Sequence, residues 1–260
     1  MDLHIKNKVY IITGSTRGIG EAIAYTFAEE GAIPVLVGRN EARGQQVLDK
    51  IKEIGVDTIF VKADLSTVEG CKGVIDQTLE KLGKIDGLVN NAGYNDGTGL
   101  DAGPEKFMAS LQLNIFHYYT LAHFAKAALI ETKGTIINVG SKVAVTGQGG
   151  TSGYAASKGG TQALTREWAV ELLPYNIRVN EVIPAETWTP LYEEYVNRFD
   201  DPEEKKQAIA QRIPLGQRFT TSEEIADMVV FLASDRASHI TGQHLYVDGG
   251  YTHLDRVIGT

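Results

Sequence analysis

The sequence has 260 residues, of which 43% are hydrophobic and 22% charged, and its formal net charge is −8 at pH 7. These proportions are ordinary for a globular protein, and the length suits one large α/β domain, so we expect a single domain over residues 1–260. No apolar run approaches the roughly 20 residues that span a bilayer, and the acidic balance gives no long-range attraction to phosphate backbones or anionic lipids. We therefore expect neither a membrane nor a nucleic acid as partner.

Cysteine content and the first residues bear on the compartment. The one cysteine, Cys71, cannot form an internal disulfide, and the opening MDLHIKNKVYIIT lacks the pattern of a secretory signal peptide. We therefore expect a cytoplasmic protein. Cys71 stands in an expected amphipathic helix with no motif beside it, so it receives no functional role.

Short apolar runs alternate with longer segments of helical spacing along the chain. Several of the runs are apolar almost throughout, as expected where helices cover both faces of a parallel sheet. The alternation predicts an α/β fold, a doubly wound parallel seven-stranded sheet of the Rossmann type with helices on both faces. Strands are expected at residues 8–13, 33–37, 58–62, 85–90, 134–139, 177–183 and 244–248, and helices at 19–30, 41–54, 68–82, 105–129, 154–173 and 222–233.

One stretch, residues 184–216, breaks this alternation. In a compact domain so long a connection usually has a function. We expect it to form a short helical lid over the substrate, with two helices between residues 191 and 219.

The glycine-rich segment TGSTRGIG (13–20) follows the first expected strand and opens the first expected helix. Gly14 permits a tight turn, Gly18 lets a pyrophosphate approach the backbone, and Gly20 lets the helix pack closely on the sheet. Alone such a segment is weak evidence, because glycines also serve simple turns, but its position after the first strand favours a nucleotide. The residues expected to meet the cofactor here are Gly14, Ser15, Thr16, Arg17, Gly18, Ile19 and Gly20.

The end of the second expected strand bears on which nucleotide binds. NAD sites usually place a carboxylate there for the ribose 2′-hydroxyl, whereas NADP sites need a cation for the 2′-phosphate. The sequence has Gly38, Arg39 and Asn40 at this point, and Arg17 lies in the glycine loop. Two guanidinium groups suit a phosphate, so NADP is expected, with NAD as the alternative, although both arginines could simply be solvated.

Two further residues are candidates for the adenine end of the cofactor. Asp64 and Leu65 follow the third expected strand, where an adenine ring could meet a side-chain acceptor and an apolar wall. Asp64 could equally cap the helix that follows.

Tyr154 and Lys158 lie four residues apart in SGYAASKGG (152–160). On a helix such residues share a face, so the phenol and the ammonium group could converge. By itself the pair has a plain alternative, a buried tyrosine with a satisfied hydroxyl and a surface lysine.

Four motifs occur together in order: TGSTRGIG, NNAG (90–93), Ser141 after the fifth expected strand, and Tyr154-x-x-x-Lys158. In this combination the chain resembles the short-chain dehydrogenase/reductase superfamily over essentially its whole length. The resemblance implies that Asn114, Ser141, Tyr154 and Lys158 form the catalytic tetrad. Tyr154 would be the base in oxidation and the acid in reduction, Ser141 would hold the substrate oxygen, Lys158 would bind the nicotinamide ribose and lower the pKa of Tyr154, and Asn114 would support a water-mediated proton path.

The resemblance also extends the cofactor site to Asn91, Ala92 and Gly93, and beyond the sixth strand to Pro184, Thr187 and Thr189. It implies a homotetramer and no metal. The family often has Pro-Gly after the sixth strand, whereas this sequence has Pro184-Ala185. We therefore expect a shifted turn there, and either threonine could meet the nicotinamide carboxamide.

Four variable segments (93–103, 141–154, 183–195 and 247–256) are similar to those of bacterial L-fucose dehydrogenases. The resemblance implies NADP-dependent oxidation of the anomeric carbon of L-fucose, or of aldoses such as L-galactose and D-arabinose, to a lactone. Polar loop residues agree with a hydroxyl-rich substrate, although each could be a simple solvated loop residue. The alternatives are an NADPH-dependent reductase of a ketone, 3-oxoacyl thioester or hydroxysteroid, and a non-catalytic NADPH sensor. The expected substrate contacts are Asn95, Asp96, Lys142, Gln148, Glu186 and Trp188.

Overall fold

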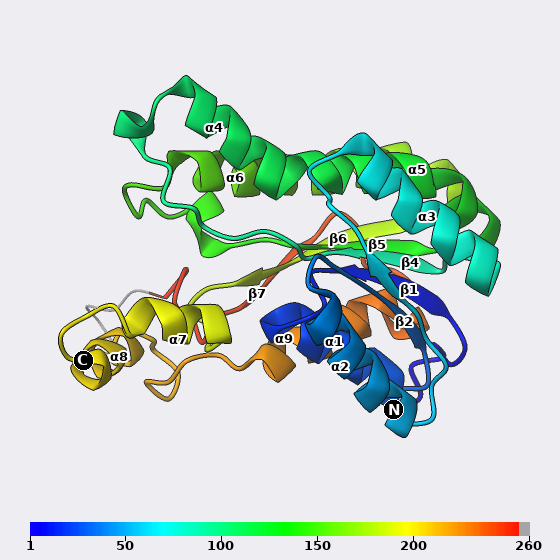
Figure 1. The fold of residues 1–260 in the computed structure, drawn as a ribbon, viewed down its shortest axis with the longest axis horizontal. Helices are drawn as coiled ribbons and strands as arrows, with labels where there is room; N and C mark the ends of the chain where they lie inside the picture. The colour runs from blue at the N-terminus through cyan, green and yellow to red at the C-terminus, as the bar shows by residue number, and fades with distance from the viewer. Residues whose placement is uncertain (255–260) are drawn as a thin grey trace.

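The computed structural model describes residues 1–254, and its centre is a seven-stranded sheet (Figure 1). The strands lie side by side in the order β3-β2-β1-β4-β5-β6-β7, and every neighbouring pair is parallel. This is the doubly wound Rossmann order that the alternation predicted. The strands are β1 (Val9–Thr13), β2 (Ile33–Gly38), β3 (Phe60–Lys62), β4 (Gly87–Asn90), β5 (Thr135–Val139), β6 (Arg178–Pro184) and β7 (His244–Val247).

Helices cover both faces of the sheet (Figure 1). One layer contains α3 (Val68–Leu82), α4 (Pro104–Leu111), α5 (His117–Thr132) and α6 (Ser152–Glu171), and the other contains α1 (Gly18–Glu29), α2 (Glu41–Glu53) and α9 (Ser222–Ala233). Side chains of successive strand residues point to opposite faces. In β1, Tyr10 and Ile12 belong to the apolar core under α1, whereas Val9 and Ile11 belong to the core under α3 and α5.

The expected helix over residues 105–129 is interrupted. Residues Gln112–Phe116 form a π-helical turn between α4 and α5. Such a turn accommodates one extra residue and is frequent at functional sites. The strand expected at 58–62 is also shorter, because only Phe60–Lys62 pair with β2. Local sequence pattern does not report either difference, since both depend on partners elsewhere in the chain.

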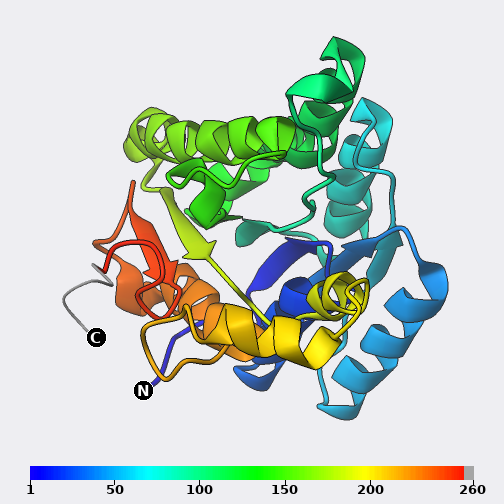
Figure 2. The same cartoon turned by 90° about the vertical axis from the view of Figure 1, so that its left-hand side faces the viewer.

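The lid segment, residues 184–216, contains two helices, α7 (Pro190–Val196) and α8 (Pro202–Ala210). Figure 1 shows α7 and α8 together beyond the end of the sheet at which the strands finish, on the side that faces the viewer in Figure 2. The base of the segment is closed by backbone hydrogen bonds from Trp188 to Thr220 (2.9 Å) and from Thr220 to Glu186 (3.0 Å). The expected pair of helices is thus confirmed.

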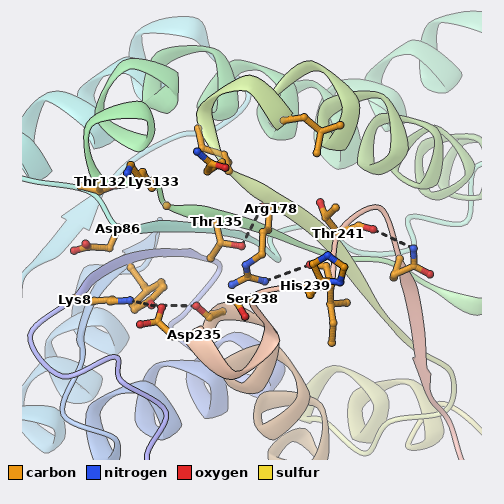
Figure 3. A pocket seen from close by; sticks show the side chains of 18 residues that line it. Lys8, Asp86, Thr132, Lys133, Thr135, Arg178, Asp235, Ser238, His239 and Thr241 are labelled. Atoms are coloured by element: carbon orange, nitrogen blue, oxygen red, sulfur yellow. Dashed lines mark hydrogen bonds and ion pairs between the residues drawn. The ribbon is translucent and has the colours of Figure 1, made fainter.

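A cavity of about 620 Å³ lies at the opposite end of the sheet, where the strands begin (Figure 3). Its walls include the ion pair of Lys8 with Asp235 (2.7 Å), and Arg178, which donates to the carbonyl oxygens of Leu232 and Ser234. Within residues 1–254, no helix is both long and apolar enough to cross a membrane.

Candidate functional site

The order of the strands reverses between β1 and β4, and ligands of such sheets bind outside the carboxyl ends of strands at this point. The predicted cofactor and tetrad residues all come from the loops and helices that follow β1 to β6. The topology therefore brings them to one end of the sheet, the end beyond which α7 and α8 lie (Figure 1).

The glycine loop makes a tight turn between β1 and α1. Gly14 and Gly18 have φ of +67° and +57°, values that favour glycine. At Gly20 a Cβ would lie 2.3 Å from the carbonyl oxygen of Gly14, so only glycine lets α1 approach the loop. The loop thus leaves its backbone open at a helix N-terminus, which suits a phosphate group.

The segment after β4 is tied to this loop. Thr13 Oγ1 accepts hydrogen bonds from the backbone N–H groups of Asn91 (2.9 Å) and Ala92 (3.0 Å), and Asn91 Nδ2 donates to the Thr13 carbonyl oxygen (2.9 Å). Ser15 Oγ accepts from the backbone of Val37. The structure therefore brings together β1, β2 and β4 at the place expected for a dinucleotide.

The cationic end of the predicted cofactor site is more open. Arg39 is exposed after β2, and Arg17 pairs with Glu194 of α7 at 3.3 Å. No acidic side chain follows β2 directly, and a Cβ on Gly38 would lie 2.7 Å from Thr16 Cγ2. A cavity of about 250 Å³ adjoins Arg17 and is lined also by Arg43 and Lys50 of α2. The sequence analysis did not single out these last two cations, because they are separated from the glycine loop by more than 20 residues.

The other predicted adenosine contacts have local structural partners. Asn40 Oδ1 accepts from the backbone N–H of Arg43 and so caps α2. Asp64 Oδ1 accepts from the backbone and hydroxyl of Ser66, and these bonds, with a smaller contribution from Arg39, lower the pKa of Asp64. Thr67, rather than Asp64, caps α3.

Asn114 lies in the π-helical turn and is fully buried. Its Oδ1 accepts from the backbone N–H of Tyr94 (2.9 Å), and its Nδ2 donates to the Ser110 carbonyl oxygen (3.1 Å). At Gly93 a Cβ would lie 2.7 Å from Asn114 Oδ1. The π turn therefore aims this amide at the segment that follows β4.

Tyr154 and Ser141 meet across the loop that joins β5 to α6. Burial raises the pKa of Tyr154 to about 12, and a hydrogen bond with Ser141 opposes that rise. The hydroxyl of Ser141 also accepts from the backbone N–H of Val143 at 3.4 Å. A phenol with so high a pKa needs a nearby positive charge before it can act as a base near neutrality.

Lys158 supplies a cation on the same face of α6, with its side chain pointing into the protein. It is 2% exposed, its Nζ lies 5.7 Å from the centre of the Tyr154 ring, and it donates to the Val139 carbonyl oxygen (2.7 Å) and to Tyr118 Oη (3.0 Å). Burial lowers the pKa of Lys158 to about 8. The plain alternative of a surface lysine is therefore wrong.

The two threonines after β6 differ in their partners. Thr189 Oγ1 caps α7 by accepting from the backbone N–H of Tyr192 (3.1 Å), whereas Thr187 Oγ1 is buried and has no partner in the described structure. A buried hydroxyl without a partner fits a polar ligand group such as a carboxamide. Ala185 does not adopt a positive φ, so the strand ends at Pro184 without a left-handed turn.

Two predicted substrate residues lie beside the tetrad. Lys142 follows Ser141 directly and forms an ion pair with Glu186, and Tyr192 of α7 donates to the other oxygen of Glu186 at 2.5 Å. The Lys142 and Glu186 side chains are each 11% exposed. Lys142 Nζ also lies 4.1 Å from the centre of the Tyr251 ring. We call Lys142, Glu186 and Tyr192 the charged cluster.

Among the remaining predicted substrate residues, Trp188 contacts the cluster through Tyr192, with ring centres 6.2 Å apart, whereas Asn95, Asp96 and Gln148 have other surroundings. Trp188 also packs edge-on against Phe219, with ring centres 5.1 Å apart, and Lys206 Nζ lies over the Trp188 ring at 4.3 Å from its centre. Asn95 and Asp96 bond within their own loop, and Asp96 also accepts from Ser110. Gln148 is exposed.

Tyr118 and Tyr192 are site residues that sequence reasoning missed. Tyr118 Oη accepts a hydrogen bond from Lys158 Nζ, and Tyr192 Oη donates one to the Glu186 carboxylate. Each lies close to other aromatic residues in the sequence, in HYY and LYEEY. Helical spacing predicts that such a residue is buried, but it does not show whether the hydroxyl group contacts a site residue.

Known proteins resemble the chain along its whole described length. A family model described as enoyl-(acyl carrier protein) reductase matches residues 14–252. The chain is 35% identical to an L-fucose dehydrogenase of Bos taurus, covering 96% of this chain and 91% of the relative. It is 36% identical to a 3-oxoacyl-[acyl-carrier-protein] reductase FabG of Chlamydia pneumoniae, with 97% and 100% covered.

Two solved structures superpose closely. One is of the Cj0485 dehydrogenase, with a TM-score of 0.95 and 44% identity over 98% of both chains. The other is of the L-sorbose reductase of Gluconobacter frateurii in complex with NADPH and L-sorbose, with a TM-score of 0.94 and 32% identity over 98% of this chain and 100% of that one. Together with the motifs at the strand ends, these similarities show that the chain belongs to the short-chain dehydrogenase/reductase superfamily of oxidoreductases.

Proposed function

We propose that this oxidoreductase is an NADP-preferring sugar dehydrogenase that oxidises the anomeric carbon of L-fucose, or of a related aldose such as L-galactose or D-arabinose, to the lactone. The charged cluster carries the proposal. It joins the ammonium group of Lys142, the residue that follows Ser141, to a carboxylate and a phenol. A hydroxyl-rich ring needs such directional partners, whereas a steroid or acyl chain would favour apolar walls.

In the proposed reaction, Tyr154 removes the proton of the anomeric hydroxyl while Ser141 holds the same oxygen. Bound oxidised nicotinamide would supply the hydride acceptor for C1, and the C1–O bond would become the lactone carbonyl. Thr187 would donate to the carboxamide, and Lys158 would bind the ribose. Because oxidation consumes the ionised phenol, whose pKa burial raises, the oxidation rate should rise with pH on the acid side of its profile.

The preference for NADP rests on Arg17 and Arg39 together with the absence of an acid directly after β2. The cavity beside Arg17 adds Arg43 and Lys50 within reach of a phosphate group. Glu194 now neutralises Arg17, so a phosphate bound there would compete with α7 for the same guanidinium group.

A second candidate is reduction of a 3-oxoacyl thioester, with the same tetrad working in reverse. Its support is the similarity to the Chlamydia reductase. That reductase is 36% identical to this chain, and the Bos taurus fucose dehydrogenase is 35% identical. The charged cluster favours the sugar, because a thioester carbonyl offers few groups for Lys142 and Glu186 to bind.

The test is the increase in reduced-nicotinamide absorbance when the purified protein meets L-fucose with NADP⁺ and then with NAD⁺, at mildly alkaline pH. We expect a clear NADP⁺-dependent increase. Tyr154→Phe should lower the rate at least about 100-fold while NADPH affinity stays within a few-fold. Tyr119→Phe, at an exposed position of α5, is the matched control and should keep full activity.

The charged cluster is tested separately by Glu186→Gln, which keeps shape and removes charge. We expect KM for the sugar to rise about tenfold with little change in cofactor affinity. Silence with every aldose, together with turnover of a 3-oxoacyl thioester and NADPH, would refute the sugar assignment and support the second candidate.

A further inference from the structure

Glu181 is a carboxylate in the middle of the core. It lies within β6, between Asn180 and Val182, and is 0% exposed. Its Oε1 has no hydrogen-bond partner in the described structure. A buried carboxylate is strongly unfavourable unless opposite charge or donors compensate for the lost water. This residue therefore requires an electrostatic explanation that packing alone does not provide.

One compensating group lies on the neighbouring strand. Glu181 pairs in register with His244 of β7, and its Oε2 lies 2.6 Å from His244 Nδ1. His244 Nε2 is in turn 2.8 Å from Nη1 of Arg166, an exposed residue of α6. A continuous polar chain thus runs from the surface to one oxygen of the carboxylate.

The other oxygen lies beside Gly140, the residue between Val139 and Ser141. A Cβ on Gly140 would lie 2.3 Å from Glu181 Oε1, so the carboxylate is pressed against the end of β5. The carbonyl oxygen of Val139 at this end accepts a hydrogen bond from Lys158 Nζ (2.7 Å), and Ser141 directly follows Gly140. The negative charge of Glu181 raises the pKa of Lys158, against the larger effect of burial, which lowers it.

The other buried carboxylate among residues 1–254, Asp248, does not have this relation to Lys158. Its two oxygens accept from the backbone N–H groups of Gly250 (2.8 Å) and Thr252 (2.9 Å). The anionic partner of the buried lysine is therefore to be sought at Glu181.

We propose that Glu181 is a positioning residue that keeps Lys158 protonated at the working pH, and that His244 and Arg166 hold Glu181 in its ionised form. The inference depends on the proposed role of Lys158 toward the cofactor, but not on which substrate is oxidised.

The direction of the effect follows from the groups that face Glu181. These are Lys158 and Arg166 from α6, His244 and Tyr246 from β7, and Tyr118 from α5. Burial raises the pKa of Glu181, whereas His244, Lys158 and Arg166 lower it. Removing the carboxylate charge takes away the electrostatic attraction that raises the pKa of Lys158, so Lys158 loses its proton at lower pH.

The experiment measures NADPH affinity by fluorescence titration between pH 6 and 10, in the wild type and in Glu181→Gln. Wild-type affinity should decline as the pH passes about 8, where Lys158 loses its charge. In Glu181→Gln the midpoint of this decline should move down by about one pH unit, which lowers the affinity near pH 8 by up to about tenfold. At pH 6 the two proteins should bind NADPH within about twofold of each other.

Conservative variants separate charge from structure. Glu181→Asp keeps the negative charge and should restore the wild-type midpoint. An affinity that falls equally at every pH in Glu181→Gln, with an unmoved midpoint, would overturn the proposal and leave a structural role. NADPH binding does not require turnover, so a shifted midpoint in a protein that oxidises no sugar would sustain this inference while refuting the sugar assignment.

A second pair of variants covers the case in which Glu181→Gln does not fold. His244→Phe removes the donor to the carboxylate and should make Glu181 take up a proton, which lowers the midpoint as well. His244→Asn can still donate through Nδ2 and should stay close to the wild type. Equal midpoints in the wild type and His244→Phe would count against the proposal.

Discussion

The hydroxyl groups of Thr187 and Thr189 show how neighbouring residues of the same type acquire different tasks. Thr189 Oγ1 satisfies a backbone N–H at the start of α7, while Thr187 Oγ1 is buried without a partner. A helix cap contributes to stability, typically about 1 kcal/mol. An unpartnered buried hydroxyl contributes none, and it is available to a ligand.

At this scale we predict that Thr187→Val weakens cofactor binding several-fold while the melting temperature stays equal or rises. Valine keeps the shape and removes only a hydroxyl that nothing satisfies in the protein itself. Thr189→Val, the matched control, should lower the stability by about 0.5–2 kcal/mol through loss of the cap. Thermal unfolding and NADPH titration of both variants check this, and a destabilised Thr187→Val with normal affinity would reverse the assignment.

Side-chain caps of the same kind also stabilise the first turn of other helices. At the start of α9, Thr221 Oγ1 accepts from the Glu224 backbone N–H (3.2 Å), and Glu224 Oε2 accepts from the Thr221 backbone N–H (2.9 Å). Arg218, just beyond the lid segment, forms a two-pronged ion pair with the same carboxylate. The cap therefore ties the residues that follow the lid segment to α9, the helix that packs on α1.

The pH dependence of this cap can be predicted. The Arg218 hydrogen bond, followed by that of Thr221, lowers the pKa of Glu224 to about 2 from its ordinary 4.5. A lowered pKa means that the carboxylate contributes stability above about pH 4.5 and loses it as the pH falls toward 2. Because the pair is partly exposed, at 54% and 40%, the contribution should be no more than about 1 kcal/mol.

We therefore expect Glu224→Gln to melt below the wild type at pH 7, with a difference that shrinks between pH 4.5 and pH 2. Thermal unfolding across this range is the measurement. Glu223→Gln, in the same turn, is the control, because Thr221 and Arg218 bond to Glu224 instead. A difference that is constant with pH would show that the carboxylate charge is unimportant to the cap.

For the whole molecule, the family resemblance leads us to propose a homotetramer. The helices expected to meet symmetry-related copies carry exposed apolar side chains in this structure. Met108 on α4, Tyr119 on α5 and Val170 on α6 are 61%, 57% and 68% exposed. Apolar surface of this kind is typical of a face that another chain covers.

We predict a particle of four times the 28.3 kDa chain mass in light scattering coupled to size exclusion. Val170→Lys should shift it to a smaller species, because a charge would be buried without a partner at the interface. Val68→Lys, an equally apolar but less exposed position on α3, is the control and should leave the mass unchanged. A wild-type monomer would refute the tetramer.

The sequence by itself was sufficient for the order of the elements and for the position of each motif at the end of its strand. Apolar periodicity and glycine chemistry act over a few residues, so the sheet, the glycine loop and the two lid helices could all be predicted. The same local character sets the limit of such predictions. The π turn at Asn114 disrupted an expected single helix, and the edge-on packing of Trp188 against Phe219 could not be read from the sequence.

What only the tertiary structure decided are contacts between residues far apart in the chain. Lys142 and Glu186, 44 residues apart, pair with each other, and Glu181 and His244 meet across 63 residues. The orientation of Lys158 toward the Val139 carbonyl likewise depends on the packing of α6 against the sheet. These interactions follow from which strands the fold places side by side, and the energy of a buried charge depends on those neighbours rather than on its own position in the sequence.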